Sequence, residues 1–123
     1  MEGLAVHHEH DDDGIVVRVK GDIDSGTVGE LVTELATALN LASTHPARLL
    51  VVDLQAVNFF GSAGLNAVLN CHEQGAAAGT SVRLVANHAE VVRPIEVTNL
   101  DRVLDIYPTL ADALRSRDTD KQA

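Results

Sequence analysis

A buried strand that leads into a serine at the start of a helix is the feature that most constrains this chain. Leu49 to Val52 form an unbroken apolar run rich in branched residues, between Pro46 and Asp53. Such a run is typical of a strand that is covered on both faces of a sheet. After a short linker, residues suited to one packed helix face recur at Leu65, Val68, Leu69, His72 and Ala76. The pattern predicts a strand that ends near Asp53 and a helix that starts near Ser62.

Ser62 lies where the N-cap of that helix is expected, and its hydroxyl group has three interpretations. In the first it only caps, accepting hydrogen bonds from the free amide groups of the first turn. In the second it is a nucleophile on a strand–serine–helix elbow. That motif requires glycine two residues before the serine, where Phe60 stands, and an acid followed by a histidine downstream. In this chain the histidines downstream of Ser62 come before the acidic residues, which is the opposite order. We therefore expect that the protein is not an enzyme and has no catalytic residue.

In the third interpretation Ser62 accepts a phosphate. A helix N-terminus favours the added anion, because it presents free N–H groups and the positive end of the helix dipole. The added charge, about −1.5 to −2, would repel an acidic partner surface and would be costly to bury against an apolar one. Asp53, Asp22 and Asp24 would strengthen that repulsion if they lie nearby. The modification could therefore control binding without refolding the protein.

The segment from Asp53 to Leu65 reads Asp-Leu-x-x-Val-x-Phe-x-Gly-Ser-x-Gly-Leu. It resembles the signature of the STAS family, and more narrowly that of the bacterial anti-sigma factor antagonists. In that family the serine at the position of Ser62 is phosphorylated by the partner, an anti-sigma factor that is also a serine kinase. The resemblance implies regulation of transcription by partner switching. The unmodified protein binds the anti-sigma factor and releases its sigma factor, and phosphorylation ends the binding. A serine phosphatase is a further partner that the resemblance implies.

The same resemblance suggests which residues face the partner. The loop at Gly21 to Asp24 matches one that lies beside the serine in the family, although taken alone its two carboxylates also suit a turn, acid–base chemistry or magnesium. Two positions depart from the usual family pattern: Gly61 replaces an aspartate, and Ala63 replaces a hydroxyl residue. The expected partner-binding residues are Asp22, Asp24, Asn58, Phe60, Gly61, Ser62, Ala63 and Gly64.

Two alternatives to this function stay open. Because Gly61 and Ala63 depart from the pattern, the chain could bind its partner without a phosphorylation switch. The family's fold is also reused widely, so the chain could be a free-standing STAS subunit that scaffolds a transporter or a signalling complex.

Composition sets further limits on the class of protein. A chain of 123 residues with 46% apolar residues suits a single domain, with a core from about residue 4 to 114 and a disordered tail over 115–123. Its net charge of −9 disfavours nucleic acid and anionic lipid. The single cysteine, Cys71, excludes an internal disulfide, and no export signal or membrane span is found, so we expect a cytoplasmic protein. We expect a monomer or a weak dimer.

The rest of the chain alternates between strands and helices. An apolar segment at 4–6 and a strand at 15–20 form a hairpin around an Asp-Gly turn, and a capping box at Thr27 opens a helix to about residue 43. A strand over 81–86 and a helix over 87–97 follow; at Pro94 the helix either kinks or starts afresh. A last strand at 103–107 precedes a helix capped by Thr109. The order predicts an α/β fold, the STAS fold, with a mixed sheet that starts with an antiparallel hairpin, four or five strands and four helices.

The N-terminal histidines offer a second set of candidate metal ligands. His7, His8 and His10 precede an acidic run, and His8 and His10 would share one strand face near Asp12. The alternative is a solvated edge before the hairpin, since no distant Cys or His has ligand spacing to complete a site. We therefore expect no metal and no cofactor. Cys71 is expected to be a core thiol without a redox role.

Overall fold

The computed structural model describes residues 3–115, and its strands form one mixed sheet in the order β1-β2-β3-β4-β5. β1 and β2 are antiparallel, and all other neighbours are parallel. The structure thus confirms an α/β fold that begins with an antiparallel hairpin, with five strands and four α-helices. The elements are β1 (Leu4–Asp11), β2 (Gly14–Ile23), α1 (Val28–Thr44), β3 (Leu49–Phe60), α2 (Ser62–Ala77), β4 (Ser81–Val85), α3 (Ala89–Val97), the short 3₁₀ helix η1 (Leu100–Arg102), β5 (Asp105–Tyr107) and α4 (Leu110–Arg115).

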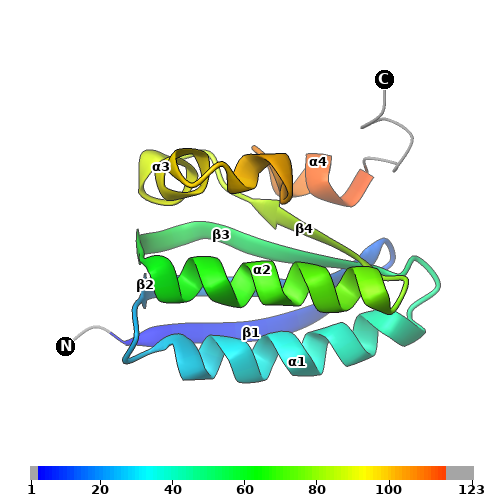
Figure 1. Ribbon diagram of the computed structural model, residues 1–123. Coiled ribbons are helices and arrows are strands. Elements are labelled where there is room, and N and C mark those ends of the chain that lie inside the picture. Colours follow the sequence, from blue (N-terminus) through cyan, green and yellow to red (C-terminus); the bar gives the residue numbers. More distant parts are fainter. Residues whose placement is uncertain (1–2, 116–123) are drawn as a thin grey trace.

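The helices cover the two faces of the sheet unequally. α1 and α2 lie side by side along one face, with α3 and α4 beyond β3 and β4 (Figure 1). Leu31 and Leu35 of α1 lie in the larger core, which α1 and α2 close together with Val91 and Ile95 of α3. α4 packs on β3, β4 and β5 in a separate, smaller core around Val51. On the side of the sheet away from α1, Ala5 and Lys20 are exposed, so the β1–β2 half of that face lacks a helix.

β3 is longer than the sequence pattern predicts. The expected end near Asp53 and the linker after it are wrong, because β3 continues to Phe60 and stays paired with β2 as far as Ile23. The ion pair between the Asp53 carboxylate and Arg18, at 3.0 Å, allows a charged residue in mid-strand. For the same reason of continued pairing, residues 21–23 are the end of β2 and not a loop.

Two β-bulges separate the beginning of β3 from its end. The pairing shifts register between Arg18 and Lys20 and again between Gly21 and Asp22, and at each shift β3 contributes one extra residue. A bulge re-aims the side chains that follow it. The alternation of buried and exposed side chains is therefore lost along the second half of β3.

The structure of α1 and α2 differs from several expectations. Thr27 precedes α1, but its hydroxyl makes no capping bond; it donates to the Asp22 carbonyl at 2.7 Å and accepts from the Asp24 amide at 3.0 Å. The apolar spacing of α1 would also place Val32 on its buried face, but Val32 is 50% exposed, and the buried residues of α1 are Leu31, Leu35, Ala38 and Ala42. In α2 the buried residue near the C-terminus is Gly75 and not Ala76.

The C-terminal region follows the prediction more closely. α3 runs through Pro94 as one helix, so the alternative of a fresh start at Pro94 is wrong. Asn99 adopts a left-handed conformation, with φ 61°, just after α3. The hydroxyl of Thr109 accepts a hydrogen bond from the Asp112 amide at 3.1 Å, as the predicted cap requires. Arg115, expected as the first residue of the tail, is instead the last residue of α4, and the rest of the expected tail, 116–123, lies outside the described residues. No helix of the described chain is both long and apolar enough to cross a membrane.

Candidate functional site at the start of helix α2

Ser62 is the first residue of α2, one position later than the N-cap that the sequence pattern predicts. Gly61 is the N-cap, with extended backbone angles, and no side chain caps α2 in the described structure. Gly61 takes this place because its N–H donates to the carbonyl of Ile23 at 3.1 Å, which fixes the chain at the end of β2 before it turns into the helix. The side chain of Ser62 is exposed. The serine therefore lies uncovered beside the free amide groups of the first turn.

The loop after β2 lies next to this turn. Because β2 and β3 are parallel, both end at the same edge of the sheet, where Asp22 pairs with Phe59 and Ile23 with Phe60. The exposed Asp24 accepts hydrogen bonds at its Oδ1 from the amides of Gly26 and Thr27, at 2.8 and 3.1 Å. These bonds give the loop a defined shape. The structure thus brings the 22–24 segment beside residues 58–64, as the resemblance implies.

Two residues expected on the partner-facing surface are instead buried. The side chain of Phe60 is 3% exposed, and Gly64 lies beneath the turn. A Cβ atom at Gly64 would lie 2.8 Å from Cε1 of Phe60 and 3.0 Å from Cγ2 of Ile23. The physical reason is close packing, since the first turn of α2 is seated directly on these side chains. Phe60 and Gly64 therefore support the surface from below.

Phe59 is the functional candidate that the sequence reasoning missed. Its side chain is 52% exposed, and its ring lies over Gly61, where an added Cβ would be 3.0 Å from Cε2. The β-bulge at Asn58 causes this, because it turns both Asn58 and Phe59 outward before Phe60 points into the core. The signal in the sequence was the pair of adjacent phenylalanines at a strand end, of which an extended chain can bury only one on a given face.

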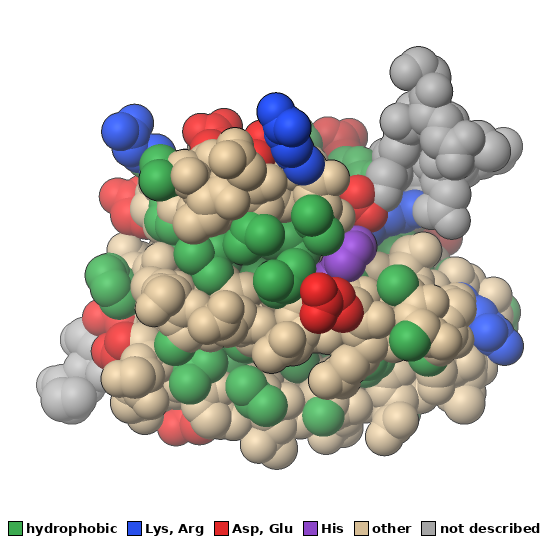
Figure 2. Space-filling view, viewed as in Figure 1, with side chains coloured by type: hydrophobic (Ala, Val, Ile, Leu, Met, Phe, Trp, Pro, Cys, Tyr) green, Lys and Arg blue, Asp and Glu red, His purple; other side chains and the backbone are tan. Residues whose placement is uncertain are grey.

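The surface that α2 contributes is nearly free of charge. Glu73 is its only acidic residue, and it contains His72 but no lysine or arginine. Apolar side chains line the junction between α2 and α3 (Figure 2). Asp53, which would have added negative charge near Ser62, does not lie there. It precedes Phe60 by seven residues of strand, or about 23 Å at 3.3 Å per residue, and its carboxylate is buried against Arg18. Of the three carboxylates expected near Ser62, only those of Asp22 and Asp24 lie at the edge of the sheet that carries Ser62.

Apart from His88, the remaining His and Cys candidates lie away from this turn. His8 contacts Glu34 and its ring meets that of His10 edge to face, with centroids 6.1 Å apart. Within residues 3–115 no three His, Cys, Asp or Glu side chains form a group that could hold a metal ion. His88 donates through Nε2 to the carbonyl of Val57 at 2.8 Å, beside the bulge. Cys71 is buried, and desolvation raises the pKa of its thiol to about 11, as befits a core residue.

Comparison with known proteins identifies the family. The model of the STAS domain matches residues 5–113. Two anti-sigma-F factor antagonists of Mycobacterium tuberculosis are similar in sequence. RsfA is 30% identical over 109 residues, which cover 86% of this chain and 81% of RsfA. RsfB is 34% identical over 108 residues, which cover 80% of this chain and 77% of RsfB.

Solved structures agree with this assignment. An anti-sigma factor antagonist from Mycobacterium paratuberculosis superposes with a TM-score of 0.82 at 34% identity, covering 91% of this chain and 92% of that one. The anti-sigma factor antagonist SpoIIAA in its unphosphorylated form has the same fold, with a TM-score of 0.70 at 18% identity and coverage of 97% and 98%. The sheet, the helix order and the serine turn thus define a STAS domain. The chain belongs to the STAS family.

Proposed function

We propose that this protein is a cytoplasmic anti-sigma factor antagonist that is controlled by phosphorylation of Ser62. In its unmodified form it binds an anti-sigma factor of the serine-kinase type, which then releases its sigma factor. Phosphorylation of Ser62 by that kinase ends the binding, and a serine phosphatase restores it. The observation that carries the proposal is the exposed Ser62 hydroxyl at the uncapped start of α2, beside the Asp24 loop, in a STAS chain with antagonist relatives.

The geometry explains how a phosphate would be accommodated within the protein. α2 has 16 residues, and the free N–H groups of its first turn and its dipole both favour an anion at this end. Because the Ser62 side chain is exposed, a phosphate would displace no core residue. The phosphorylated protein should therefore keep the same fold.

The same geometry explains how the phosphate would end binding. The contact surface joins a nearly uncharged helix to the exposed ring of Phe59, with Asp24 at its border. A phosphate adds about −1.5 to −2 charges at the middle of this surface, which a partner would have to desolvate. Asp22 and Asp24 add repulsion of the same sign. The switch therefore acts through the energy of the interface and needs no internal motion.

The proposal is tested with the serine-kinase anti-sigma factors encoded in the same genome. Each is mixed with the unmodified protein, and complex formation is measured by calorimetry. ATP is then added and the modified residue is located by mass spectrometry. We expect one stable complex, phosphate on Ser62, and loss of the complex after modification. Ser25→Ala is the matched control, because Ser25 is an exposed serine on the neighbouring loop; it should behave as the parent, whereas Ser62→Ala should bind and not be modified.

Two results would contradict the proposal. If no anti-sigma factor binds and the protein instead co-purifies with a membrane transporter, the scaffold alternative holds. If binding occurs but Ser62 remains unmodified, the protein is an antagonist without a switch.

Phe59 should be the main apolar anchor of the complex. Exposed aromatic residues that become buried at the centre of an interface commonly contribute more than about 2 kcal/mol. Phe59→Ala should therefore weaken the anti-sigma factor complex by about thirtyfold or more in calorimetry. Val97→Ala is the control, because Val97 is 74% exposed on α3. Equal affinities of the two variants would show that Phe59 lies outside the interface.

A further inference from the structure

β1 forms an outer edge of the sheet. It pairs with β2 alone among the described strands, in one unbroken antiparallel register from Leu4 opposite Gly21 to Asp11 opposite Gly14. A strand paired on one side presents the backbone N–H and C=O groups of alternate residues on its other side. Eight residues of β1 thus offer a regular template for another extended chain.

This edge has few of the features that usually protect one. Natural edge strands are blocked by charged side chains, above all lysine, by proline or by a bulge, or are covered by another element. β1 has the sequence LAVHHEHD, without lysine, arginine or proline, and its pairing with β2 shows no register shift. Its two carboxylates, Glu9 and Asp11, lie in its second half, so the first half carries no charged Asp, Glu, Lys or Arg side chain. The bulges of this sheet lie between β2 and β3 instead. β1 is therefore open to strand addition.

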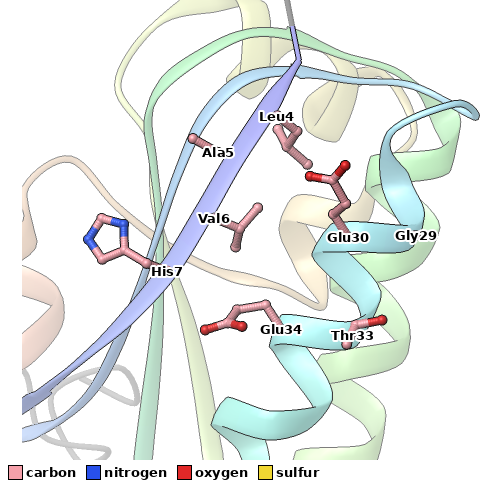
Figure 3. Close-up of a pocket in the computed structure, with 8 residues that line it drawn as sticks. All are labelled: Leu4, Ala5, Val6, His7, Gly29, Glu30, Thr33 and Glu34. Atoms are coloured by element: carbon pink, nitrogen blue, oxygen red, sulfur yellow. The ribbon is translucent and has the colours of Figure 1, made fainter.

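A groove runs between β1 and α1. It has a volume of about 690 Å³. Figure 3 shows Leu4 and Val6 on the side of β1 that faces α1, with the carboxylates of Glu30 and Glu34 opposite them, whereas His7 points to the other side of the strand. The floor of the groove is thus apolar and its helical wall is acidic. The residues that line it are Leu4, Ala5, Val6, His7, Gly29, Glu30, Thr33 and Glu34.

We propose that β1 and this groove bind an extended basic segment of another protein, which adds to the sheet as a further strand. Main-chain hydrogen bonds to the edge would hold the segment, and side chains on one of its faces would enter the groove. Lysine or arginine would meet Glu30 and Glu34, and an apolar residue would cover Val6.

The charge of the edge selects this occupant over a second copy of the chain. β1 carries Glu9 and Asp11 but no lysine or arginine, and the first turns of α1 carry Glu30 and Glu34. His7 and His8 of β1 contact Glu9 and Glu34, and they add positive charge only when protonated. Two copies joined edge to edge would bring these carboxylates together, in chains that each have a net charge of −9. Like charges at such a junction oppose association. The proposal does not depend on Ser62, which lies on a different element, so it can fail while the proposed function stands.

The test uses a short peptide of alternating lysine and valine with blocked ends, titrated into the isotope-labelled protein at low salt. Amide NMR signals of β1 and of the first turns of α1 should shift, and amide hydrogen exchange along β1 should slow. The variant Glu30→Gln/Glu34→Gln should bind the peptide about two- to thirtyfold more weakly, as expected for the loss of two exposed ion pairs. The matched control Glu90→Gln/Glu96→Gln removes the same charge from exposed sites on α3 and should bind as the parent. The dispersion of the amide signals shows that each variant is folded.

Three outcomes would overturn the proposal. In the first, a peptide of alternating glutamate and valine shifts the same signals equally. In the second, the groove variant and the control variant lose affinity alike, which would indicate attraction to net charge only. In the third, the β1 signals shift with protein concentration in the absence of peptide, which would identify a second copy as the occupant.

Discussion

Replacing Gly64 with alanine should destabilise the protein, although the same change usually stabilises a helix. The new Cβ would lie 2.8 and 2.9 Å from Cε1 and Cδ1 of Phe60 and 3.0 Å from Cγ2 of Ile23. Both neighbours are buried and cannot move freely, and overpacking of this kind costs about 1–3 kcal/mol. Gly29 provides a matched control in the first turn of α1, because an added Cβ there meets nothing within 4 Å. Neither glycine has a positive φ, so alanine strains neither backbone.

The two variants separate packing from helix propensity. Alanine gains at most about 1 kcal/mol over glycine in a helix, and both variants share this gain. Gly64→Ala should therefore be about 1–3 kcal/mol less stable than Gly29→Ala. In urea unfolding followed by circular dichroism, this corresponds to midpoints about 1 M apart, for a slope of about 1–3 kcal/mol per molar. Equal midpoints would refute the inference that the serine-bearing turn is seated tightly on Phe60 and Ile23.

Three further predictions concern single side chains, all measured by urea unfolding. The pKa of the Cys71 thiol is 9.0 in the unfolded chain and about 11 in the folded protein. The free energy of unfolding should therefore fall by about 2–3 kcal/mol as the pH rises from about 9 to about 11. Cys71→Ala should lack this decline. Arg18→Met should lower the free energy of unfolding by about 1–3 kcal/mol, because it leaves the Asp53 carboxylate buried without its ion pair. The double variant Arg18→Met/Asp53→Asn should recover part of this loss. Ser62→Ala should change stability by less than about 0.5 kcal/mol, because the exposed hydroxyl caps nothing, whereas Ser62→Glu should add about 0.3–1 kcal/mol through the helix dipole. A loss above 1 kcal/mol in Ser62→Ala would show that the hydroxyl caps the helix after all.

The sequence predicts the fold well because apolar runs and helical periodicity are local signals. The mixed sheet, the hairpin, the serine at the start of a helix and the cap at Thr109 all follow from such patterns. The end of β3 does not, because the partner that permits Asp53 in mid-strand is Arg18, 35 residues earlier in the chain. A charged residue after an apolar run looks like a strand end until its ion pair is known.

The site was predicted less completely, for a related reason. A β-bulge depends on pairing with a neighbouring strand, so neither bulge of β3 is visible in a single segment. The bulge at Asn58 decides that Phe59 faces outward and Phe60 inward, whereas the sequence pattern led us to expect Phe60 on the partner-facing surface and gave no role to Phe59. The position of Ser62 as first helical residue likewise depends on the bond from the Gly61 amide to Ile23.

That bond between Gly61 and Ile23 also has a consequence for the kinetics of association. It joins the serine turn to the end of β2, and the loop that begins at Asp24 is held by two further bonds to its own carboxylate. The two segments are thus shaped before any partner arrives, so little backbone freedom is lost on contact. A surface prepared in this way should bind without a slow rearrangement, and the lifetime of each complex would then be set by dissociation.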